Sequence, residues 1–346
     1  MERIRIGLIG AGRNTRDRHI PGFQAIEGVG IASVVNRSEA SARAVAEAFG
    51  IPRVAESVAA LLADPGIDAV CIGTWPNKHC EYTVAALQAG KHVLCEARMA
   101  MNAGEAEAMR AASAARPDRV AQIVPAPFDF RLGPTIARLV AEGALGRILE
   151  AHVVVLNGSG LDPQRALHWR HRRELSGNNV MTLGIYQEML QRWLGPATRV
   201  VAHARVFVDR RVDPETGAET PVEIPDSLTV AADFECGARV TYALSAVAAG
   251  VPANDVLLFG DRATLAWHFG DTAEITPLGG AATPIEPDPG SDRGWRVEAD
   301  FIDSIRQGTP VRLTNLRDGV RYMRFTDAVT QSWREGRAVD VAPLAD

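Results

Sequence analysis

The sequence predicts an α/β domain over residues 1–125, followed by an α+β domain over residues 126–346. In the first part, short apolar runs alternate with segments of helical period, the pattern of a parallel sheet built from βαβ units. In the second part, strand-like runs follow one another with few helices between them, which is typical of an antiparallel or mixed sheet. A chain of 346 residues is also longer than one compact core usually supports.

The expected elements of the first domain alternate along the chain. Strands are expected at residues 4–9, 31–35, 69–73, 92–95 and 120–124. Helices are expected at residues 38–49, 58–63, 79–88 and 103–115. Ser38 and Asn102 are suitable N-cap residues for the first and last of these helices, and Gly50 is suited to end the first.

The second domain is expected to begin after Pro125. Helices are expected there at residues 134–143, 297–307 and 316–333. Strands are expected at residues 148–156, 200–208, 228–234, 239–246, 255–259 and 264–267. Residues 209–225 and 279–292 are rich in Pro, Gly, Asp and Thr, so we expect loops in both segments.

Composition and charge exclude several classes of protein. The formal net charge is -5 and no basic block is long enough to follow a phosphate backbone, so nucleic acid is not an expected partner. No apolar stretch approaches the length that spans a bilayer, and a strand pattern starts at once, so neither a membrane segment nor a signal peptide is expected. The four cysteines have no metal-binding spacing, and we expect no metal. Free thiols fit a reducing compartment, and the expected location is the cytoplasm.

A glycine-rich turn follows the first strand. Gly10 and Gly12 form a GxG pair where the strand of residues 4–9 ends. Such glycines let backbone N–H groups approach a pyrophosphate at the N-terminus of the next helix, so the turn predicts a Rossmann domain that binds a dinucleotide. Thr15 replaces the third glycine of the usual fingerprint, in an unusually polar segment.

The end of the second strand indicates which dinucleotide is bound. Proteins that use NAD place Asp or Glu there to hold the ribose 2′-hydroxyl group. This chain has Arg37 and Ser38, which can pair with and donate to a 2′-phosphate, while Arg13 in the facing loop can add a second positive charge. The alternative is that Arg37 is a solvated surface residue. The sequence favours NADP(H) over NAD(H).

Further motifs together resemble one family. They are TWPNKH at residues 74–79, AALQAGKHVLCE at residues 85–96, GALG at residues 143–146, the pair Trp169 and Arg170, and DFIDSIRQG at residues 300–308. With the GxG strand, they resemble the family of glucose–fructose oxidoreductase and inositol 2-dehydrogenase, written Gfo/Idh/MocA. The resemblance covers nearly the whole chain.

The resemblance implies a Rossmann domain followed by a predominantly antiparallel, open sheet whose face covers the nicotinamide. It implies that a secondary alcohol of a small sugar, cyclitol or related polyol is oxidised, or the ketone reduced. It also implies a homodimer or homotetramer assembled through the second domain. By position, the cofactor would be lined by Gly10, Gly12, Arg13, Asn14, Asn36, Arg37, Ser38, Thr74, Trp75, Asn77, His79, Glu96, Trp169 and Arg170.

The chain departs from the family at a residue that usually supports proton transfer. The family signature is Glu-Lys-Pro, whereas Ala97 and Arg98 follow Glu96 here. Ala97 cannot transfer a proton. Arg98 stays charged, so it can anchor a substrate but cannot act as a base.

The second family signature places Asp four residues before His. Here the two positions hold Thr182 and Tyr186, which would share one face of a helix. The resemblance to glucose–fructose oxidoreductase, which has tyrosine at this place, implies an acid/base role for Tyr186, with its pKa lowered by Arg98 and by an oxidised nicotinamide. The alternative is a buried tyrosine that packs the domain interface. His168 can hydrogen-bond a substrate or relay a proton.

Three functions remain open from the sequence. The preferred one is an NADP(H)-dependent dehydrogenase or reductase in which Tyr186 is the acid/base and Arg98 anchors the substrate. The second is a redox-neutral lyase or glycoside hydrolase that keeps its nicotinamide tightly bound. The third is a non-catalytic regulator that binds a cofactor and a sugar.

Overall fold

The chain, whose structure here is a computed structural model, forms two compact units. The structure describes residues 3–250 and 252–344. The first unit comprises residues 1–125 and 296–320, and the second comprises residues 126–295 and 321–346. We expected the second domain to continue without interruption from residue 126. Residues 296–320 instead belong with the first unit.

The returning segment joins the first unit through a helix and a loop. Its helix α9 (Val297–Gln307) contacts α1 (Ile20–Gln24), where the ring of Phe301 lies 6.5 Å from that of Phe23. The loop after α9 pairs with β5 (Ala121–Ile123), since the N–H of Ile123 donates to the carbonyl of Thr314 at 3.0 Å. These contacts explain why the segment returns.

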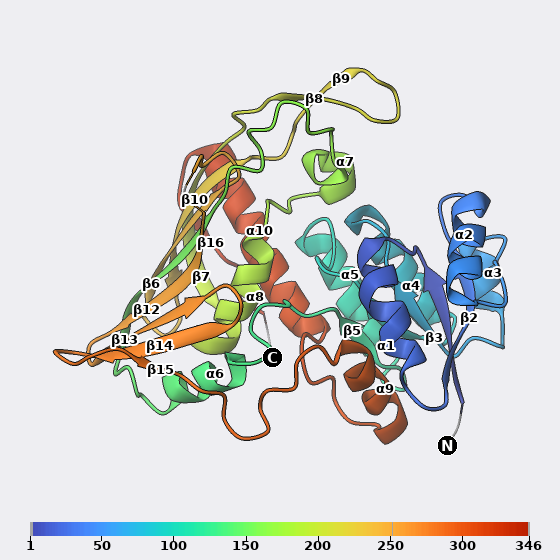
Figure 1. Cartoon of the computed structure of the whole chain (residues 1–346), viewed down its shortest axis with the longest axis horizontal. Coiled ribbons are helices and arrows are strands. Elements are labelled where there is room, and N and C mark those ends of the chain that lie inside the picture. Colours follow the sequence, from blue (N-terminus) through green and yellow to red (C-terminus); the bar gives the residue numbers. More distant parts are fainter. Residues whose placement is uncertain (1–2, 251, 345–346) are drawn as a thin grey trace. The chain divides into compact units, whose positions relative to one another are not determined.

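The first unit is built on a five-stranded parallel sheet in the order β2-β1-β3-β4-β5 (Figure 1). The other strands are β1 (Ile4–Ile9), β2 (Val29–Val35), β3 (Ala69–Ile72) and β4 (His92–Cys95). All five expected strands form, each with ends close to those predicted from the apolar runs. The predicted α/β class is confirmed.

Besides α9, four helices in this unit were expected. They are α2 (Glu39–Phe49), α3 (Val58–Ala63), α4 (His79–Gln88) and α5 (Ala103–Ala114), and a 3-10 turn, η2 (Pro76–Lys78), precedes α4. The side chain of Asn102 accepts from the backbone N–H of Glu105 at 2.9 Å, and Gly50 ends α2 with φ +66°. These caps are those that the sequence predicted.

One helical segment was not expected. Residues 15–24 form a π-helical turn, η1 (Thr15–His19), which continues into α1. The sequence does not predict this helix because the residues after Gly12 are polar. Its buried apolar side chains are those of Ile20 and Phe23, too few to give an apolar pattern of helical period.

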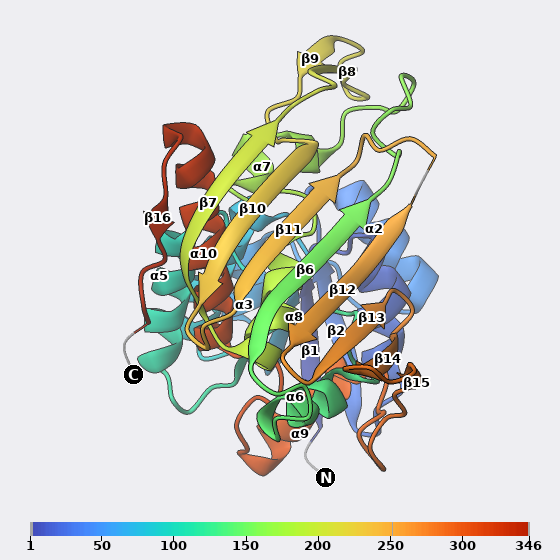
Figure 2. The same ribbon diagram turned by 90° about the vertical axis from the view of Figure 1, so that its left-hand side faces the viewer.

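The second unit contains a nine-stranded sheet in the order β15-β14-β13-β12-β6-β11-β10-β7-β16 (Figure 2). Its strands are β6 (Ile148–Leu156), β7 (Ala197–Arg205), β10 (Ser227–Phe234), β11 (Arg239–Ser245), β12 (Ala253–Gly260), β13 (Ala263–His268), β14 (Thr272–Pro277), β15 (Thr283–Pro284) and β16 (Val339–Asp340). Neighbouring strands are antiparallel except for β6 and β11. The predominantly antiparallel sheet is therefore confirmed.

Some expectations for this unit were wrong. β7 begins at Ala197, earlier than the strand expected at residues 200–208. The expected loop at residues 209–225 contains a separate hairpin of β8 (Arg210–Val212) and β9 (Glu219–Pro221), and β14 was not expected. The hairpin strands are too short and too exposed to show an alternating pattern.

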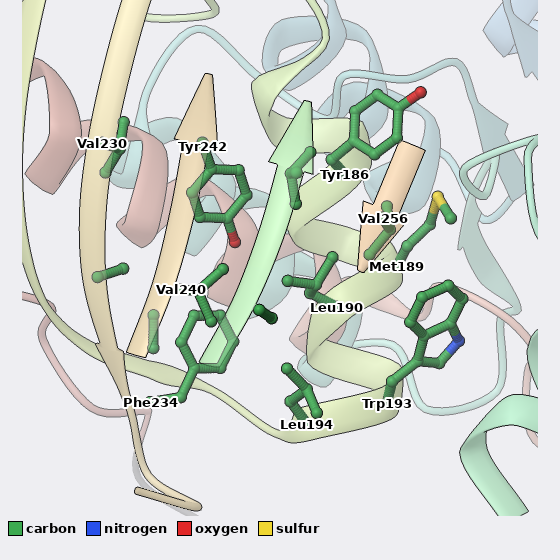
Figure 3. Packing of buried hydrophobic residues seen from close by; sticks show 14 of the residues in the cluster. Tyr186, Met189, Leu190, Trp193, Leu194, Val230, Phe234, Val240, Tyr242 and Val256 are labelled. Carbon is green, nitrogen blue, oxygen red and sulfur yellow. The ribbon is translucent and has the colours of Figure 1, made fainter. Parts of the chain in front are cut away.

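Helices cover one face of this sheet. They are α6 (Gly133–Ala141), α8 (Leu183–Leu194) and the part of α10 (Leu316–Glu335) that lies beyond Val320, while a 3-10 turn, η3 (Trp169–His171), and α7 (Arg173–Ser176) lie in the loop before α8. Figure 3 shows Leu190 and Met189 of α8 packed against strand residues such as Val240 and Val256. Figure 2 shows the opposite face with no helix of the described part of this unit over it.

Within the described residues, the helices are too short or too polar for any of them to traverse a bilayer.

Replacing Leu190 by Ala should lower the free energy of unfolding by about 3 kcal/mol, because its fully buried side chain would leave a cavity. Leu278→Ala is the matched control, since Leu278 is 85% exposed and its loss should change stability by less than about 0.5 kcal/mol. Urea denaturation of both variants measures the difference. Equal losses would contradict the assigned core.

Candidate functional site

The turn after β1 has the backbone of a phosphate-binding loop. Gly10 has φ +82°, and a Cβ atom there would lie 2.7 Å from Cγ2 of Thr74. Gly12 is different, because the nearest atom to a Cβ there would be the carbonyl oxygen of Gly73 at 3.4 Å. The space over Gly12 is therefore open, as the approach of a pyrophosphate to the backbone requires.

The structure explains the missing third glycine. Thr15, which takes that position, is 1% exposed, and its hydroxyl donates to the carbonyl of Gly10 at 3.4 Å. A Cβ atom on Gly73, at the end of β3, would collide with the Thr15 hydroxyl oxygen. The small residue that the close approach needs thus lies on the neighbouring strand.

Two polar residues that follow β2, Asn36 and Ser38, form hydrogen bonds within the first unit. Asn36 accepts from the backbone N–H of Ala11 at 2.8 Å, so it holds the glycine-rich loop in place. The Ser38 hydroxyl caps α2, accepting from the N–H of Ser41 at 3.3 Å and donating to its Oγ at 3.1 Å. We expected Ser38 to donate to a 2′-phosphate. In this structure its proton is used at the helix N-terminus instead.

Arg37 remains placed to meet a ligand. Its guanidinium lies 5.5 Å from the centre of the Trp75 ring. Asn36 and Arg37 line a cavity of about 840 Å³ beside α2. Arg13 is 91% exposed and pairs with Asp17 at 3.3 Å, so part of its charge is already balanced.

The loop after β3 carries two buried polar atoms that fit a bound cofactor. Among the described residues, Thr74 Oγ1 and Asn77 Oδ1 have no hydrogen-bond partner. Buried polar atoms are normally paired, so a ligand with hydroxyl or amide groups would complete both. With the open backbone at Gly12, these atoms fit the expected dinucleotide.

His79 has a different position from the one we expected. It is fully buried, and its ring nitrogens lie 3.0 Å from the carbonyl oxygens of Arg98 and Thr74. Burial lowers its pKa. His79 therefore joins the loops after β3 and β4, and no surface of its ring is open to a cofactor, so its predicted cofactor contact is corrected.

Glu96 contacts His19, which sequence reasoning missed, and His19 in turn contacts Glu298, which was also missed. Oε1 of Glu96 lies 2.9 Å from Nε2 of His19, and Nδ1 of His19 lies 2.5 Å from Oε1 of Glu298. Asn14 donates its side-chain N–H to the same Glu96 oxygen. No sequence signal links His19 to Glu298, because they are far apart in the chain and the fold alone brings them together.

The charges of this cluster affect one another. Burial by itself would lower the pKa of His19, but the hydrogen bonds and charges of Glu298 and Glu96 outweigh it and raise this pKa to about 9. Burial would raise the pKa of Glu96, but His19 and Asn14 lower it overall. Protonated His19 thus stabilises the fold. This contribution to stability is complete below about pH 6.5 and is lost as the pH rises through about 9.

Arg98 has little surface for the anchoring role that we predicted. It is 4% exposed, and its carbonyl oxygen is the partner of His79. The anchoring role stays a prediction, since it needs the guanidinium to reach a substrate from this buried position.

Tyr186 lies in the first turn of α8. Its backbone N–H donates to the carbonyl of Thr182 at 3.1 Å, so the two residues are one helical turn apart as predicted, and Thr182 Oγ1 is buried without a hydrogen-bond partner among the described residues. The Tyr186 hydroxyl donates to Oδ1 of Asn254 on β12, and its ring lies 5.4 Å from that of Phe128. Figure 3 shows the hydroxyl pointing away from Met189 and Leu190.

The pKa of Tyr186 is raised, not lowered as we expected. Burial is the main cause, because it disfavours the phenolate, and the charge of Asp255 adds to it, while the hydrogen bond to Asn254 acts in the opposite direction. Tyr186 is therefore a neutral hydroxyl at physiological pH, which is the form that donates a proton.

His168, Trp169 and Arg170 lie together in the second unit. His168 Nδ1 accepts from the backbone N–H of Arg170 at 3.3 Å, and burial, with the charges of Arg170 and Arg165, lowers the His168 pKa to about 4. His168 is then a neutral ring whose Nε2–H is a donor. Arg170 stacks on Trp169 at 4.2 Å. Their cofactor and substrate contacts stay predictions.

Metal ligands are not gathered in the described part of the chain: no three His, Cys, Asp or Glu residues there could hold an ion together.

Gly10→Ala should destabilise the first unit by about 1 kcal/mol or more, because alanine is strained at positive φ and its Cβ meets Thr74. Gly12→Ala should fold normally but bind a dinucleotide at least about tenfold more weakly, because the methyl group occupies the space over the loop. Thermal denaturation and fluorescence titration with NADPH separate the two effects. Unchanged binding by Gly12→Ala would contradict the assigned pyrophosphate position.

Comparison with known proteins agrees with the geometry. Residues 4–123 match the oxidoreductase family with an NAD-binding Rossmann fold, and residues 134–266 match the GFO/IDH/MocA C-terminal domain. An uncharacterized oxidoreductase of Synechocystis sp. is 31% identical over 76% of this chain and 71% of its own length. An NADP(+) D-xylose 1-dehydrogenase of Haloferax volcanii is 30% identical over 93% of this chain and 95% of its own length.

A solved structure shares the fold along its whole length. Levoglucosan dehydrogenase in complex with NADH and levoglucosan has a TM-score of 0.87 at 21% identity, covering 99% of this chain and 100% of that chain. The two matched domains and the relatives show the family, and the solved structure shows the same fold. The chain belongs to the Gfo/Idh/MocA family of oxidoreductases.

Proposed function

We propose that this protein is an NADP(H)-dependent dehydrogenase or reductase that acts on a secondary alcohol or ketone of a sugar, cyclitol or related polyol. The observation that carries the proposal is the open backbone at Gly12 beside the buried polar atoms of Thr74 and Asn77, which find no hydrogen-bond partner in the described part of the chain. The names of three relatives, levoglucosan dehydrogenase, D-xylose 1-dehydrogenase and D-apiose dehydrogenase, support a sugar-like substrate.

The preference for NADP(H) depends on this chain's own residues. The relatives differ, because levoglucosan dehydrogenase was solved with NADH whereas the D-xylose enzyme is named for NADP(+). Here the segment after β2 has no carboxylate at residues 36–38, and Arg37 lies beside Trp75 at the edge of the cavity. A guanidinium in that place pairs with a 2′-phosphate, whereas a carboxylate would repel it.

A bound nicotinamide would accept or supply the hydride. The residues of this chain would bind the dinucleotide and move the proton. Tyr186 would give its hydroxyl proton to the substrate oxygen in the reducing direction, with Asn254 orienting that hydroxyl. Because burial raises the pKa of Tyr186, its hydroxyl is protonated at neutral pH, and acid/base catalysis would require a positively charged ligand nearby to lower that pKa.

Assembly and location complete the proposal. On the open face of the second unit's sheet, five side chains from neighbouring strands lie in one row across the sheet: Leu257, His152, Thr241, Ala231 and Val201. Three of the five are apolar, and we propose that a second copy of the chain covers this face in a homodimer or homotetramer. The four cysteines are all free thiols, which supports a cytoplasmic location.

Arg37→Ala should weaken NADPH binding by about 2 kcal/mol, roughly 30-fold, because the charged partner of the 2′-phosphate is lost. NADH binding should change by less than about threefold, since NADH lacks that phosphate. Arg110→Ala, which removes an arginine of α5 paired with Glu107, is the control and should affect neither. An equal loss for both dinucleotides would remove the argument for NADP(H).

Tyr186→Phe should lower kcat by about 10²- to 10⁴-fold while leaving the Kd for NADPH unchanged, because the proton donor is lost and the dinucleotide loop is not. Tyr242→Phe is the matched control, since it removes another buried hydroxyl, one that donates to Gln187 in the core. Its kcat should remain close to that of the unaltered protein. Steady-state assays over a panel of sugars and their keto forms measure both, and near-normal turnover by Tyr186→Phe would refute the acid/base role.

A further inference from the structure

His19 lies between two carboxylates inside the first unit. It is the last residue of η1, the π-helical turn that follows the glycine-rich loop, and its side chain has no exposed surface. Nε2 meets Glu96 at the end of β4, and Nδ1 meets Glu298 on α9. Gly22 makes room for this contact, because a Cβ there would lie 2.6 Å from Oε2 of Glu298.

The geometry requires two N–H donors on the His19 ring. Ionised carboxylates are acceptors only, and a neutral imidazole has just one N–H group. A neutral ring would therefore point a lone pair at one of the two carboxylate oxygens at hydrogen-bond distance. The imidazolium satisfies both contacts, and it leaves the trio of His19, Glu96 and Glu298 with one net negative charge instead of two.

The trio is coupled to the loop that would bind the dinucleotide. Asn14 directly precedes η1, and its side-chain N–H donates to the Glu96 oxygen that also meets His19. Because the amide nitrogen of Asn14 faces Glu96, the amide oxygen is the atom of this side chain that is left to accept a hydrogen bond from a ligand. The other Glu96 oxygen accepts from the backbone N–H of Ala97 at 3.1 Å, which fixes the carboxylate plane.

We propose that His19 is a positioning residue for the cofactor: as an imidazolium it balances the negative charge behind the phosphate loop and holds Glu96 so that Asn14 presents its amide oxygen to the dinucleotide. The inference rests on dinucleotide binding by the first unit, which is part of the proposed function. A second negative charge near the pyrophosphate would oppose binding, because charges in a partly buried site interact through a low effective dielectric.

The groups that face His19 define the pH response. Glu96 comes from β4 and Glu298 from α9, while the nearby Cys71 thiol of β3 stays neutral because burial raises its pKa. Carboxylates do not change charge in the alkaline range. An alkaline change in dinucleotide affinity that depends on residue 19 therefore reports the His19 ring.

A charge-reversal cycle tests the proposal on the full-length protein. His19→Gln removes the positive charge but keeps one donor group, the neutral amide NH2, so the Kd for NADPH should rise about tenfold at neutral pH. The double variant His19→Gln, Glu298→Gln restores one net negative charge and places a neutral amide with its own N–H donor at position 298, so its Kd should return to within about threefold of the original. His268→Gln, at a partly exposed histidine 2.6 Å from Asp255, is the control and should leave Kd unchanged.

Two outcomes of the cycle would overturn the proposal. One is an unchanged Kd in His19→Gln. The other is a double variant that binds no better than His19→Gln, which is what loss of packing alone predicts, since packing losses add. If the unaltered protein binds neither NADPH nor NADH, the proposed dinucleotide site is wrong and the inference about His19 fails with it. If the unaltered protein binds a dinucleotide but the variants give either outcome above, only the inference about His19 fails.

The pH profile provides a second test, which does not need His19→Gln to fold. In the unaltered protein, the Kd for NADPH should rise as the pH passes about 9, where His19 loses its proton. In Glu298→Gln, one carboxylate that stabilises the imidazolium is gone, so the rise should begin at a lower pH. An alkaline rise at the same pH in both proteins, or its absence from both, would overturn the proposal.

Discussion

The loops after β1 and β3 approach each other so closely that only particular residues fit, and the dinucleotide site depends on this approach. The N–H of Gly73 donates to the carbonyl of Ile9 at 2.9 Å, which continues the β1–β3 pairing past the end of the strands. Gly10 then lies against Thr74, and Thr15 lies against Gly73. The approach places the open backbone of Gly12 and the buried polar atoms of Thr74 and Asn77 at the same edge of the sheet.

Local features of the first unit could be predicted because the chemistry of each is local. An apolar run identifies a buried strand, and a serine or asparagine before a helical segment identifies a cap, so the elements of the sheet and the ends of α2 and α5 were correct. Contacts between distant segments have no such signal. Glu298 reaches His19 only because α9 returns to the first unit, and His79 bridges two loops that periodicity cannot place together.

The candidate proton-transfer residue shows a different limit. The spacing of Thr182 and Tyr186 correctly predicted one helical turn between them, since spacing along a helix is a property of the backbone. The pKa of Tyr186 depends instead on burial and on Asn254, which comes from a strand far along the sequence. A residue type and its position therefore indicate a role, whereas the protonation state follows from the packing around it.

The division of the chain has a consequence for how the protein is made. The first unit needs residues 296–320, so it is still incomplete when the ribosome has released residue 125. Until α9 emerges, β5 lacks its partner at Thr314 and His19 has one carboxylate instead of two. Most of the second unit is synthesised in that interval. The first part of the chain to be translated is therefore completed late, after the nine-stranded sheet of the second unit has most of its strands.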